Sequence, residues 1–553
     1  MKIKKEIVYL LLIILLAGIL RFCKLGSYPT LTVDAAAVGY NAYSIIKTGR
    51  DEFGEKLPVF FKSYGEEKLP LYIYEAVVPV ALFGLNIFSA RFSTALMATL
   101  TVLILYFFVE EILKYIKIKD KSLKKWLPLA SSFFLAIMPW HIQFSREIFG
   151  QESLFWVLLG CFLSFKFLNK KKEKYWFYAM LSFSAGLMTY HAAKVFVPIW
   201  IAYILILIWK RDQFKKAFKL GILAIILTGS IWLWMSNSTL GANRANDVSA
   251  FGKNSNVRAN LWEAQIISQG QPVLYTRFLH NKVEAYTRDI LQRYFSHFNP
   301  EFLFFEGNIE REKSKVPYSG MLLWTSLPFF AIGLYSLIKK KIWPVLIFLI
   351  ISPIVSAITF GATNSVRSIY TTAGLAVICG LGLLVSLKSV KSKILWVIFT
   401  ILFLQSFLTY LNSYYVHQNY FYAKDWQYET KQIVSDITKV QNNYKEIVVT
   451  ANMGGNPYIY FLFYNQYDPL KWQAQANENI ELDEGTSFIH IRKLDNIRFI
   501  SEACVENENL KNDTLYLCKA GTQTGDFKII KNYYWPNGKK SFVLGVKNNL
   551  LLD

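Results

Sequence analysis

Uncharged apolar runs recur along most of this chain of 553 residues. Ile7 to Leu20 and Phe92 to Val109, for example, contain no charged side chain. A helix needs about 20 mainly apolar residues to cross a bilayer, because each residue adds about 1.5 Å to its length. Hydrophobic residues make up 53% of the chain, more than a soluble domain of this size needs. The sequence therefore predicts a polytopic α-helical membrane protein.

About eleven transmembrane helices are predicted from these runs. The first begins with basic residues, as a signal peptide does, but Phe22 to Leu25 follow it instead of a small-residue cleavage site. We therefore expect a retained first span. A further apolar run, Leu69 to Leu85, is expected to re-enter the bilayer or to lie at its surface. The predicted spans are roughly 6–22, 88–112, 127–144, 152–168, 175–191, 194–209, 217–235, 321–338, 342–360, 366–387 and 393–413.

Basic residues cluster between the spans, and this clustering predicts the orientation. Cytoplasmic segments carry an excess of Lys and Arg. With the N-terminus cytoplasmic and eleven spans, every lysine block falls inside, whereas counting Leu69 to Leu85 as a span would move the later blocks outside. The net charge of +22 is thereby explained by topology, and without a nucleic-acid motif we predict no nucleic-acid partner. The blocks are Lys2 to Lys5, Lys114 to Lys125, Lys166 to Lys174, Lys210 to Lys219, Lys339 to Lys341 and Lys388 to Lys393.

This topology leaves three large extracytoplasmic pieces. They are a first loop at about 23–87, a loop at about 236–320, and a C-terminal α/β domain at 414–553 that follows a transmembrane domain at 1–413. In the C-terminal domain Cys504 and Cys518 are either a disulfide or two unpaired thiols. A helix is predicted over Trp426 to Val440, an apolar segment over Tyr458 to Tyr464, and strands over Glu446 to Thr450, Ser487 to Ile491, Thr514 to Cys518 and Ser541 to Val546.

The first loop carries two candidate functional residues. Asp34 precedes a helix-forming stretch that continues to Ile46, so it is either a helix N-cap or an exposed functional acid. Lys68 directly precedes the re-entrant run, where a point charge suits an anionic head group. A lysine that extends to the membrane surface to reach water is the alternative.

The short outward turns carry the remaining candidates. Arg146, Glu147 and Glu152 lie in one turn, where a structural ion pair is the alternative to a functional role. His191 and Lys194 lie in a second turn, and Arg367 lies in a third. A satisfied interfacial histidine is the alternative for His191. The predicted topology puts all of these residues on one side of the membrane and at one depth, which suits a reaction between a lipid-anchored phosphate compound and an outward acceptor.

Several short motifs resemble those of GT-C membrane glycosyltransferases. The resemblance is greatest to family 39, which includes protein O-mannosyltransferases and the aminoarabinose transferase of lipid A. It covers about residues 6 to 410, with an acid soon after the first helix. The similar motifs are Lys68-Leu69-Pro70-Leu71, Phe83-Gly84, Ala90-Arg91-Phe92-Ser93, Pro139 to Arg146, Tyr190 to Lys194 with Pro198, and Val366-Arg367. The chain departs from the family in having Ala35 after Asp34, and Glu152 where many members have Asp.

The resemblance implies transfer of a sugar from a polyprenyl-phosphate donor, usually with inversion, to a glycan, lipid or protein acceptor at the outer face of the cell membrane. It implies Asp34 as the catalytic carboxylate that takes a proton from the acceptor or orients it. Positive charge would stabilise the departing phosphate. Lys68, Arg146, Lys194 and Arg367 are the candidates for that charge. Glu152 and His191 are candidates for binding the acceptor or a divalent metal ion.

Two other classes of protein stay open at this point. A transporter or flippase of lipid-linked sugars would also place charges in a membrane cavity, although such proteins often show repeated halves and this chain shows no internal symmetry. A catalytically silent membrane scaffold is the second, because no acid follows Asp34. The large outward loops favour the transferase.

Overall fold

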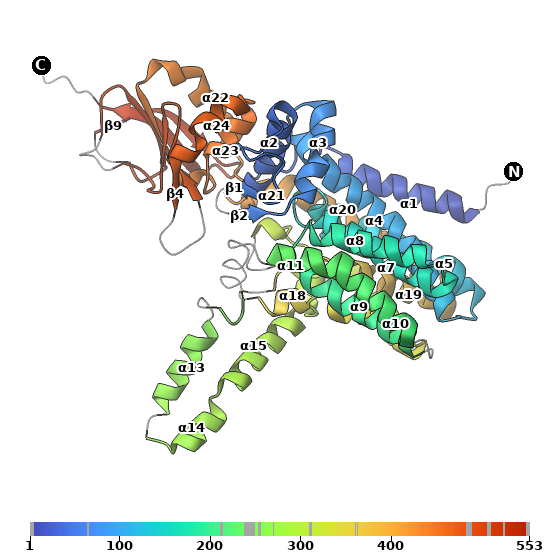
Figure 1. The fold of residues 1–553 in the computed structure, drawn as a ribbon. Coiled ribbons are helices and arrows are strands. Elements are labelled where there is room, and N and C mark those ends of the chain that lie inside the picture. The colour runs from blue at the N-terminus through green and yellow to red at the C-terminus, as the bar shows by residue number, and fades with distance from the viewer. Residues whose placement is uncertain are drawn as a thin grey trace, which may run out of the picture. The chain divides into compact units, whose positions relative to one another are not determined.

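The computed structural model describes residues 5–63, 66–210, 214–236, 249–252, 256–268, 270–308, 312–359, 361, 363–482, 489–505, 510–523 and 526–548. The chain divides into two units. Their helices and strands are labelled in Figure 1. Unit 1 comprises Met1–Cys23, Thr94–Ser145 and Phe149–Ser413. Unit 2 comprises Lys24–Ser93, Arg146–Ile148 and Tyr414–Asp553.

Unit 1 is helical, and helix occupies each of the eleven predicted spans. Prolines interrupt two of these spans, because proline lacks the backbone N–H that continues a helix: α5 ends before Pro139, and α17 ends before Pro353. The elements are α1 (Lys5–Phe22), α4 (Ile87–Tyr115, begun in unit 2), α5 (Lys121–Ile137), α6 (Pro139–Phe144), α7 (Gln151–Lys170), α8 (Glu173–Leu187), α9 (Ala193–Trp209), α10 (Phe214–Ala224), η1 (Ile225–Gly229), α11 (Ser230–Ser236), α13 (Asn256–Ile267), α14 (Val273–Leu279), α15 (Lys282–Ser296), η2 (Glu301–Phe305), η3 (Glu312–Ser314), η4 (Trp324–Ser326), α16 (Leu327–Lys339), α17 (Trp343–Ile351), α18 (Ile354–Ala357), α19 (Thr371–Ser389) and α20 (Lys393–Asn412).

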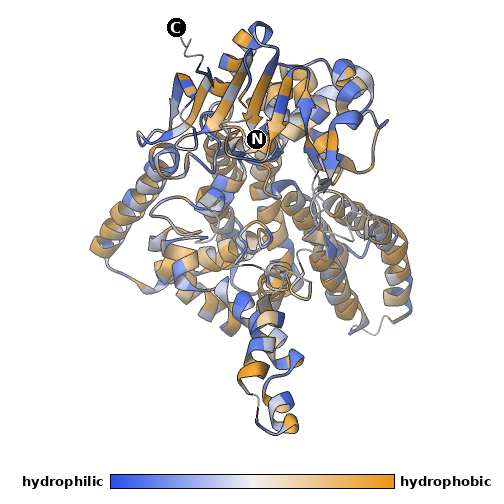
Figure 2. Ribbon diagram, turned by 90° about the vertical axis from the view of Figure 1, so that its left-hand side faces the viewer, coloured by the Kyte–Doolittle hydropathy of each residue, from blue (hydrophilic) through white to orange (hydrophobic). Residues whose placement is uncertain are grey.

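Five helices in the described part of the chain are long and apolar enough to cross a membrane. In the helix over Lys393–Tyr422 only 11% of the most apolar window is buried, so most of its surface needs a non-aqueous environment. Figure 2 shows that many of the helices are hydrophobic along much of their length. The count of about eleven spans stays a prediction. The five helices are Ile87–Tyr115, Gln151–Lys170, Phe214–Met235, Thr371–Ser389 and Lys393–Tyr422.

Glycines allow close packing of helices in unit 1. A Cβ atom at Gly333 of α16 would clash with the carbonyl oxygen of Ile378, and one at Gly382 of α19 would clash with that of Phe329. Small residues let helix backbones approach in this way in membrane proteins. Large rings fill the remaining core, among them the fully buried Trp140, Trp176 and Trp200.

A buried arginine ties α1 to the end of α5. The Arg21 guanidinium donates to the carbonyl oxygens of Ala136 at 3.0 Å and Leu135 at 3.2 Å, and it lies 2.6 Å from Nδ1 of His141. A buried guanidinium is tolerated here because both of its terminal nitrogens have hydrogen-bond partners.

Unit 2 joins the first loop to the C-terminal segment in one hydrophobic core. Ala35 and Tyr40 of the loop lie in the same buried cluster as Tyr458, Phe461 and Trp472. The elements are α2 (Val33–Thr48), β1 (Phe61–Ser63), β2 (Glu66–Lys68), α3 (Leu71–Phe83), η5 (Ser413–His417), α21 (Gln418–Tyr422), α22 (Thr430–Val440), η6 (Gln441–Asn443), β3 (Glu446–Thr450), η7 (Ala451–Met453), α23 (Tyr458–Tyr464), α24 (Pro469–Ala476), η8 (Asn477–Asn479), β4 (Ile480–Leu482), β5 (Ile489–Ile491), β6 (Lys493–Leu494), β7 (Ile497–Ile500), β8 (Thr514–Lys519), β9 (Phe527–Tyr534) and β10 (Lys540–Lys547).

A sheet of six described strands forms the C-terminal part of unit 2, in the order β6-β7-β3-β8-β10-β9. The central strand β3 runs parallel to both β7 and β8, whereas β10 is antiparallel to β8 and β9. The strands predicted over Glu446 to Thr450, Thr514 to Cys518 and Ser541 to Val546 are confirmed. β5 covers the last part of the predicted strand over Ser487 to Ile491, of which Ser487 lies outside the described residues. The predicted helix begins at Thr430 instead of Trp426.

The two cysteines of this segment are bonded. Cys504 and Cys518 form a disulfide with their Cα atoms 4.6 Å apart, and Cys518 lies on β8. Such bonds persist in oxidising compartments.

Candidate active site

Asp34 lies in the first turn of α2 but does not cap it. The N-cap is Thr32, whose Oγ1 accepts a hydrogen bond from the Ala35 backbone N–H at 3.4 Å. The capping alternative for Asp34 is therefore wrong, because the helix begins two residues earlier than that alternative requires. A carboxylate in the first turn is stabilised by the positive end of the helix dipole.

Lys68, at the end of strand β2, forms an ion pair with Asp34. Its Nζ atom lies 2.6 Å from Oδ1 of Asp34, which makes a charge-assisted hydrogen bond. The Lys68 side chain is 5% exposed and that of Asp34 is 38% exposed. A buried ammonium group thus orients a carboxylate that solutes can still reach.

A second ion pair lies next to the start of α2 and is completely buried. The Arg91 guanidinium contacts the Glu147 carboxylate and donates to the carbonyl oxygens of Pro29 at 2.6 Å and Thr30 at 2.7 Å. Glu147 also accepts from the Thr32 hydroxyl at 2.8 Å. The pair therefore holds the residue that caps the helix carrying Asp34. The sequence assigned Arg91 no role, although the Ala90-Arg91 motif pointed to it, and it offered Glu147 only as an acid of a structural ion pair.

Arg146 is fully buried in unit 2. It donates to the Tyr28 carbonyl oxygen at 2.8 Å, and its guanidinium lies over the rings of Tyr415 and Tyr414, at 5.4 and 5.8 Å from their centroids. Cation–π contacts of this kind stabilise a desolvated charge. Glu147, one of the two acids in the same turn, forms an ion pair with Arg91.

A tyrosine that sequence reasoning missed also belongs to this region. Burial raises the pKa of Tyr460, and the nearby Tyr464, Asp34 and Glu147 raise it further. Tyr460 therefore stays protonated as a hydrogen-bond donor close to two carboxylates. It lies in α23, more than 400 positions after Asp34, and no local pattern links the two.

The other four predicted residues belong to unit 1. Glu152 is buried in the first turn of α7 and accepts a hydrogen bond from Thr94. Lys194, in the first turn of α9, donates from Nζ to the Met235 carbonyl oxygen at 3.1 Å. His191 lies in the turn before α9. Arg367 lies in the turn before α19, with its backbone N–H bonded to Asn364.

Within unit 1 the start of α7 lies next to the turn before α9 and the turn before α19. The Ser153 hydroxyl is 2.8 Å from the Tyr370 hydroxyl, three residues after Arg367. A Cβ atom at Gly150 would lie 3.2 Å from the Tyr190 ring, next to His191. The structure thus brings the turns of Glu152, His191 and Arg367 side by side, while Asp34, Lys68 and Arg146 are positioned within unit 2.

The described residues do not fit a metal site. They contain no group of three or more His, Cys, Asp or Glu side chains that could hold an ion. Lys68 and Arg91 already neutralise the two acids nearest the start of α2, which leaves a donor set poorly suited to a divalent cation.

Comparison with known proteins gives a family-model match over part of the chain and a similar fold. Residues 68–234 match the family model described as dolichyl-phosphate-mannose-protein mannosyltransferase. An uncharacterised protein of Aquifex aeolicus is 29% identical over 187 residues, which are 34% of this chain and 40% of that protein. ArnT from Cupriavidus metallidurans has a similar structure when bound to undecaprenyl phosphate (TM-score 0.51, 11% identity, 97% of this chain and 98% of that chain) and in the apo state (0.50, 10%, 98% and 98%).

The fold and the family match confirm the predicted resemblance to the GT-C superfamily of membrane glycosyltransferases. The multi-pass helical part and the C-terminal sheet both agree with this class.

Proposed function

We propose that this protein transfers a sugar from a polyprenyl-phosphate-linked donor to a glycan, lipid or protein acceptor at the outer face of the cytoplasmic membrane. The observation that carries the proposal is the Asp34–Lys68 pair, a partly exposed carboxylate fixed by a buried ammonium at a helix N-terminus. The family model and the fold shared with an undecaprenyl-phosphate-bound ArnT support the class of donor.

In the proposed reaction the acceptor hydroxyl oxygen attacks the anomeric carbon of the donor sugar, and the Asp34 carboxylate takes the proton of that hydroxyl group. The bond between that carbon and the donor phosphate oxygen breaks, and the polyprenyl phosphate leaves with the electron pair. A single displacement of this kind inverts the anomeric centre. Lys68, Arg146, Lys194 and Arg367 supply positive charge for the leaving phosphate, and Glu152 and His191 bind the acceptor. No step requires a metal ion.

The proposed topology puts the N-terminus in the cytoplasm and the large loops and the C-terminal domain (414–553) outside. The lysine blocks support it through the positive-inside rule. The Cys504–Cys518 disulfide supports an oxidising compartment for the C-terminal domain. α3 has 13 residues and is about 20 Å long, too short to span a bilayer core of about 30 Å.

Replacing Asp34 with Asn tests the assignment. We expect at least a hundredfold loss of sugar transfer with normal membrane insertion, because general base catalysis contributes about 10²–10⁴. Transfer is measured by mass spectrometry of cell-envelope glycans from three kinds of cells: cells that lack the protein, cells in which it is restored, and cells that express the variant. The matched control is Asp436→Asn, since Asp436 also pairs with a lysine, Lys531, at 2.6 Å in unit 2.

Unchanged transfer in Asp34→Asn would remove Asp34 from the mechanism. Loss of sugar transfer in both variants would show only that the substitutions disrupt the folding of unit 2. If deleting the chain left every envelope glycan linkage intact but stopped lipid-linked sugars from reaching the outer face, the protein would be a transporter.

A further inference from the structure

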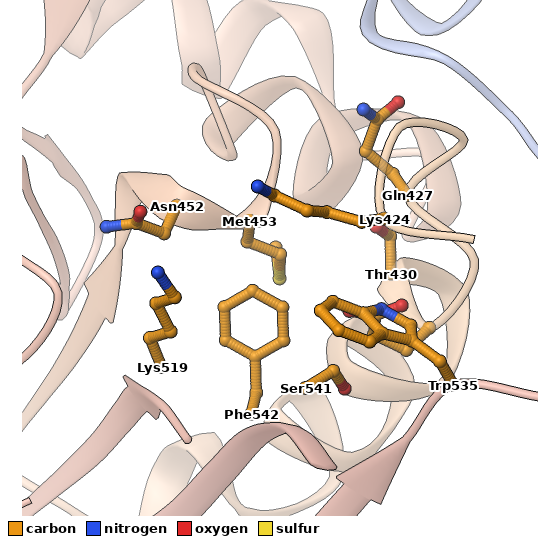
Figure 3. A pocket seen from close by; sticks show the side chains of 10 residues that line it. Lys424, Gln427, Thr430, Asn452, Met453, Lys519, Trp535, Ser541 and Phe542 are labelled. Carbon is orange, nitrogen blue, oxygen red and sulfur yellow. The ribbon is translucent and has the colours of Figure 1, made fainter. Parts of the chain in front are cut away.

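A pocket opens in unit 2 at one edge of the six-stranded sheet (Figure 3). Its floor and walls come from the end of β8, the start of β10, the turn after β3 and the segment before α22. β3 and β8 are parallel, so their carboxyl ends meet at this edge. Ligands of α/β sheets commonly bind outside the carboxyl ends of the strands. The hollow contains about 400 Å³ of empty space, part of which is open solvent.

Polar groups without partners lie in the wall of this pocket. Thr430 is 1% exposed and Glu429 is 6% exposed. Oγ1 of Thr430 has no hydrogen-bond partner among the described residues, and Oε2 of Glu429 has none there beyond the contact of its carboxyl group with the Ser541 hydroxyl. The other Glu429 oxygen accepts from the Trp535 indole N–H at 3.1 Å. Buried polar atoms usually have partners, and each exception calls for an explanation. A ligand that carries hydroxyl groups would provide partners for both atoms.

Aromatic and basic side chains complete the lining. In Figure 3 the rings of Trp535 and Phe542 lie beside each other in the pocket, with Lys424 and Lys519 at its rim. Both lysines are exposed, and neither has an ion-pair partner in the described part of the chain. The Trp535 ring presents an apolar face while its N–H is held by Glu429. Two ammonium groups at the mouth attract an anion.

We propose that this pocket binds a sugar ring that carries an acidic group, with the ring on Trp535 and the acidic group between Lys424 and Lys519. Burial raises the pKa of Glu429, which favours its neutral form and lessens its repulsion of the anion. Lys424 follows the helix over Lys393–Tyr422 by two residues, so the pocket lies close in sequence to a membrane-capable segment. An acidic sugar of the acceptor is the natural occupant; that last assignment, unlike binding itself, rests on the proposed transferase function.

The test is a titration of the purified full-length protein with methyl β-D-glucuronide and with the uncharged methyl β-D-glucoside, in the absence of donor. We expect at least tenfold tighter binding of the glucuronide. Trp535→Ala and the double variant Lys424→Ala/Lys519→Ala should each weaken it at least tenfold. The control Lys528→Ala, an exposed lysine on β9 outside the pocket lining, should bind normally.

Three outcomes would overturn the proposal. They are equal binding of the two sugars, unchanged binding in the pocket variants, and lysine-dependent binding of phosphatidylglycerol vesicles without glucuronide binding, which would indicate a lipid head group. Asp34→Asn should bind the glucuronide normally, so loss of transfer and loss of this pocket are distinguishable.

Discussion

At the scale of single residues, the loop that carries Asp34 also contains a buried carboxyl group at Glu52. Asn41 donates to Glu52 Oε1 at 3.0 Å, and the Tyr458 hydroxyl donates to Oε2 at 3.3 Å. Burial raises the pKa of Glu52 from 4.5 to about 8, although the hydrogen bond from Asn41 opposes that increase. Near neutral pH the Glu52 carboxyl group is therefore protonated in the folded chain and ionised in the unfolded chain.

This predicts a falling stability between about pH 4.5 and pH 8, because across that range the native state binds more protons than the unfolded state. Glu52→Gln imitates the neutral acid and should flatten the dependence. We expect the variant to gain more than about 1 kcal/mol over wild type at pH 8, since one pKa unit corresponds to about 1.4 kcal/mol, and little at pH 5. Thermal unfolding of the detergent-solubilised protein at both pH values measures this. Parallel curves for the two proteins would contradict it.

At the scale of elements, the position of Asp34 depends on how α2 begins. Thr32 caps the helix and also bonds to Glu147, which is held by Arg91. One hydroxyl group thus connects the helix to a buried ion pair. Removing either charged partner from such a pair is costly because the other charge is left desolvated.

Thr32→Ala should destabilise unit 2 by about 1–2 kcal/mol, since an N-cap to alanine change costs about 0.5–2 kcal/mol and a hydrogen bond to a carboxylate is also lost. Thr32→Ser keeps the hydroxyl and should be close to wild type. The measurement is the unfolding temperature, together with protease resistance of the first loop. Equal behaviour of the alanine and serine variants would show that the cap is unimportant.

At the scale of the whole molecule, the orientation of the lysine blocks can be tested with single cysteines. In a Cys23→Ser background, Lys56→Cys in the first loop should react with an impermeant thiol reagent in intact cells. Lys340→Cys, between α16 and α17, should not react until the membrane is opened. Both positions are exposed, while Cys161 and Cys379 are buried. Labelling of residue 340 from outside would mean that Leu71–Phe83 spans the bilayer.

Much of the helical part was predictable because hydropathy is a local property. Helix lies in every predicted span, and lysine blocks separate many of them. Interruptions were harder: the runs through Met138 and Ser352 look continuous by hydropathy, yet a following proline divides each. In unit 2 the short segment Tyr458–Tyr464 is apolar throughout, so its periodicity does not separate a helix from a strand.

The sequence by itself determined the class of molecule and the residues that carry charge in its outward loops. Apolar runs must leave water, and lysine blocks resist crossing the bilayer, whatever the rest of the chain does. Tertiary structure alone decided which charges pair. Asp34 meets Lys68 and Arg91 meets Glu147 across long sequence separations, and the pocket gathers residues from 424 to 542 at one sheet edge. Such contacts depend on how elements pack, and packing between distant segments produces no periodic pattern in the sequence.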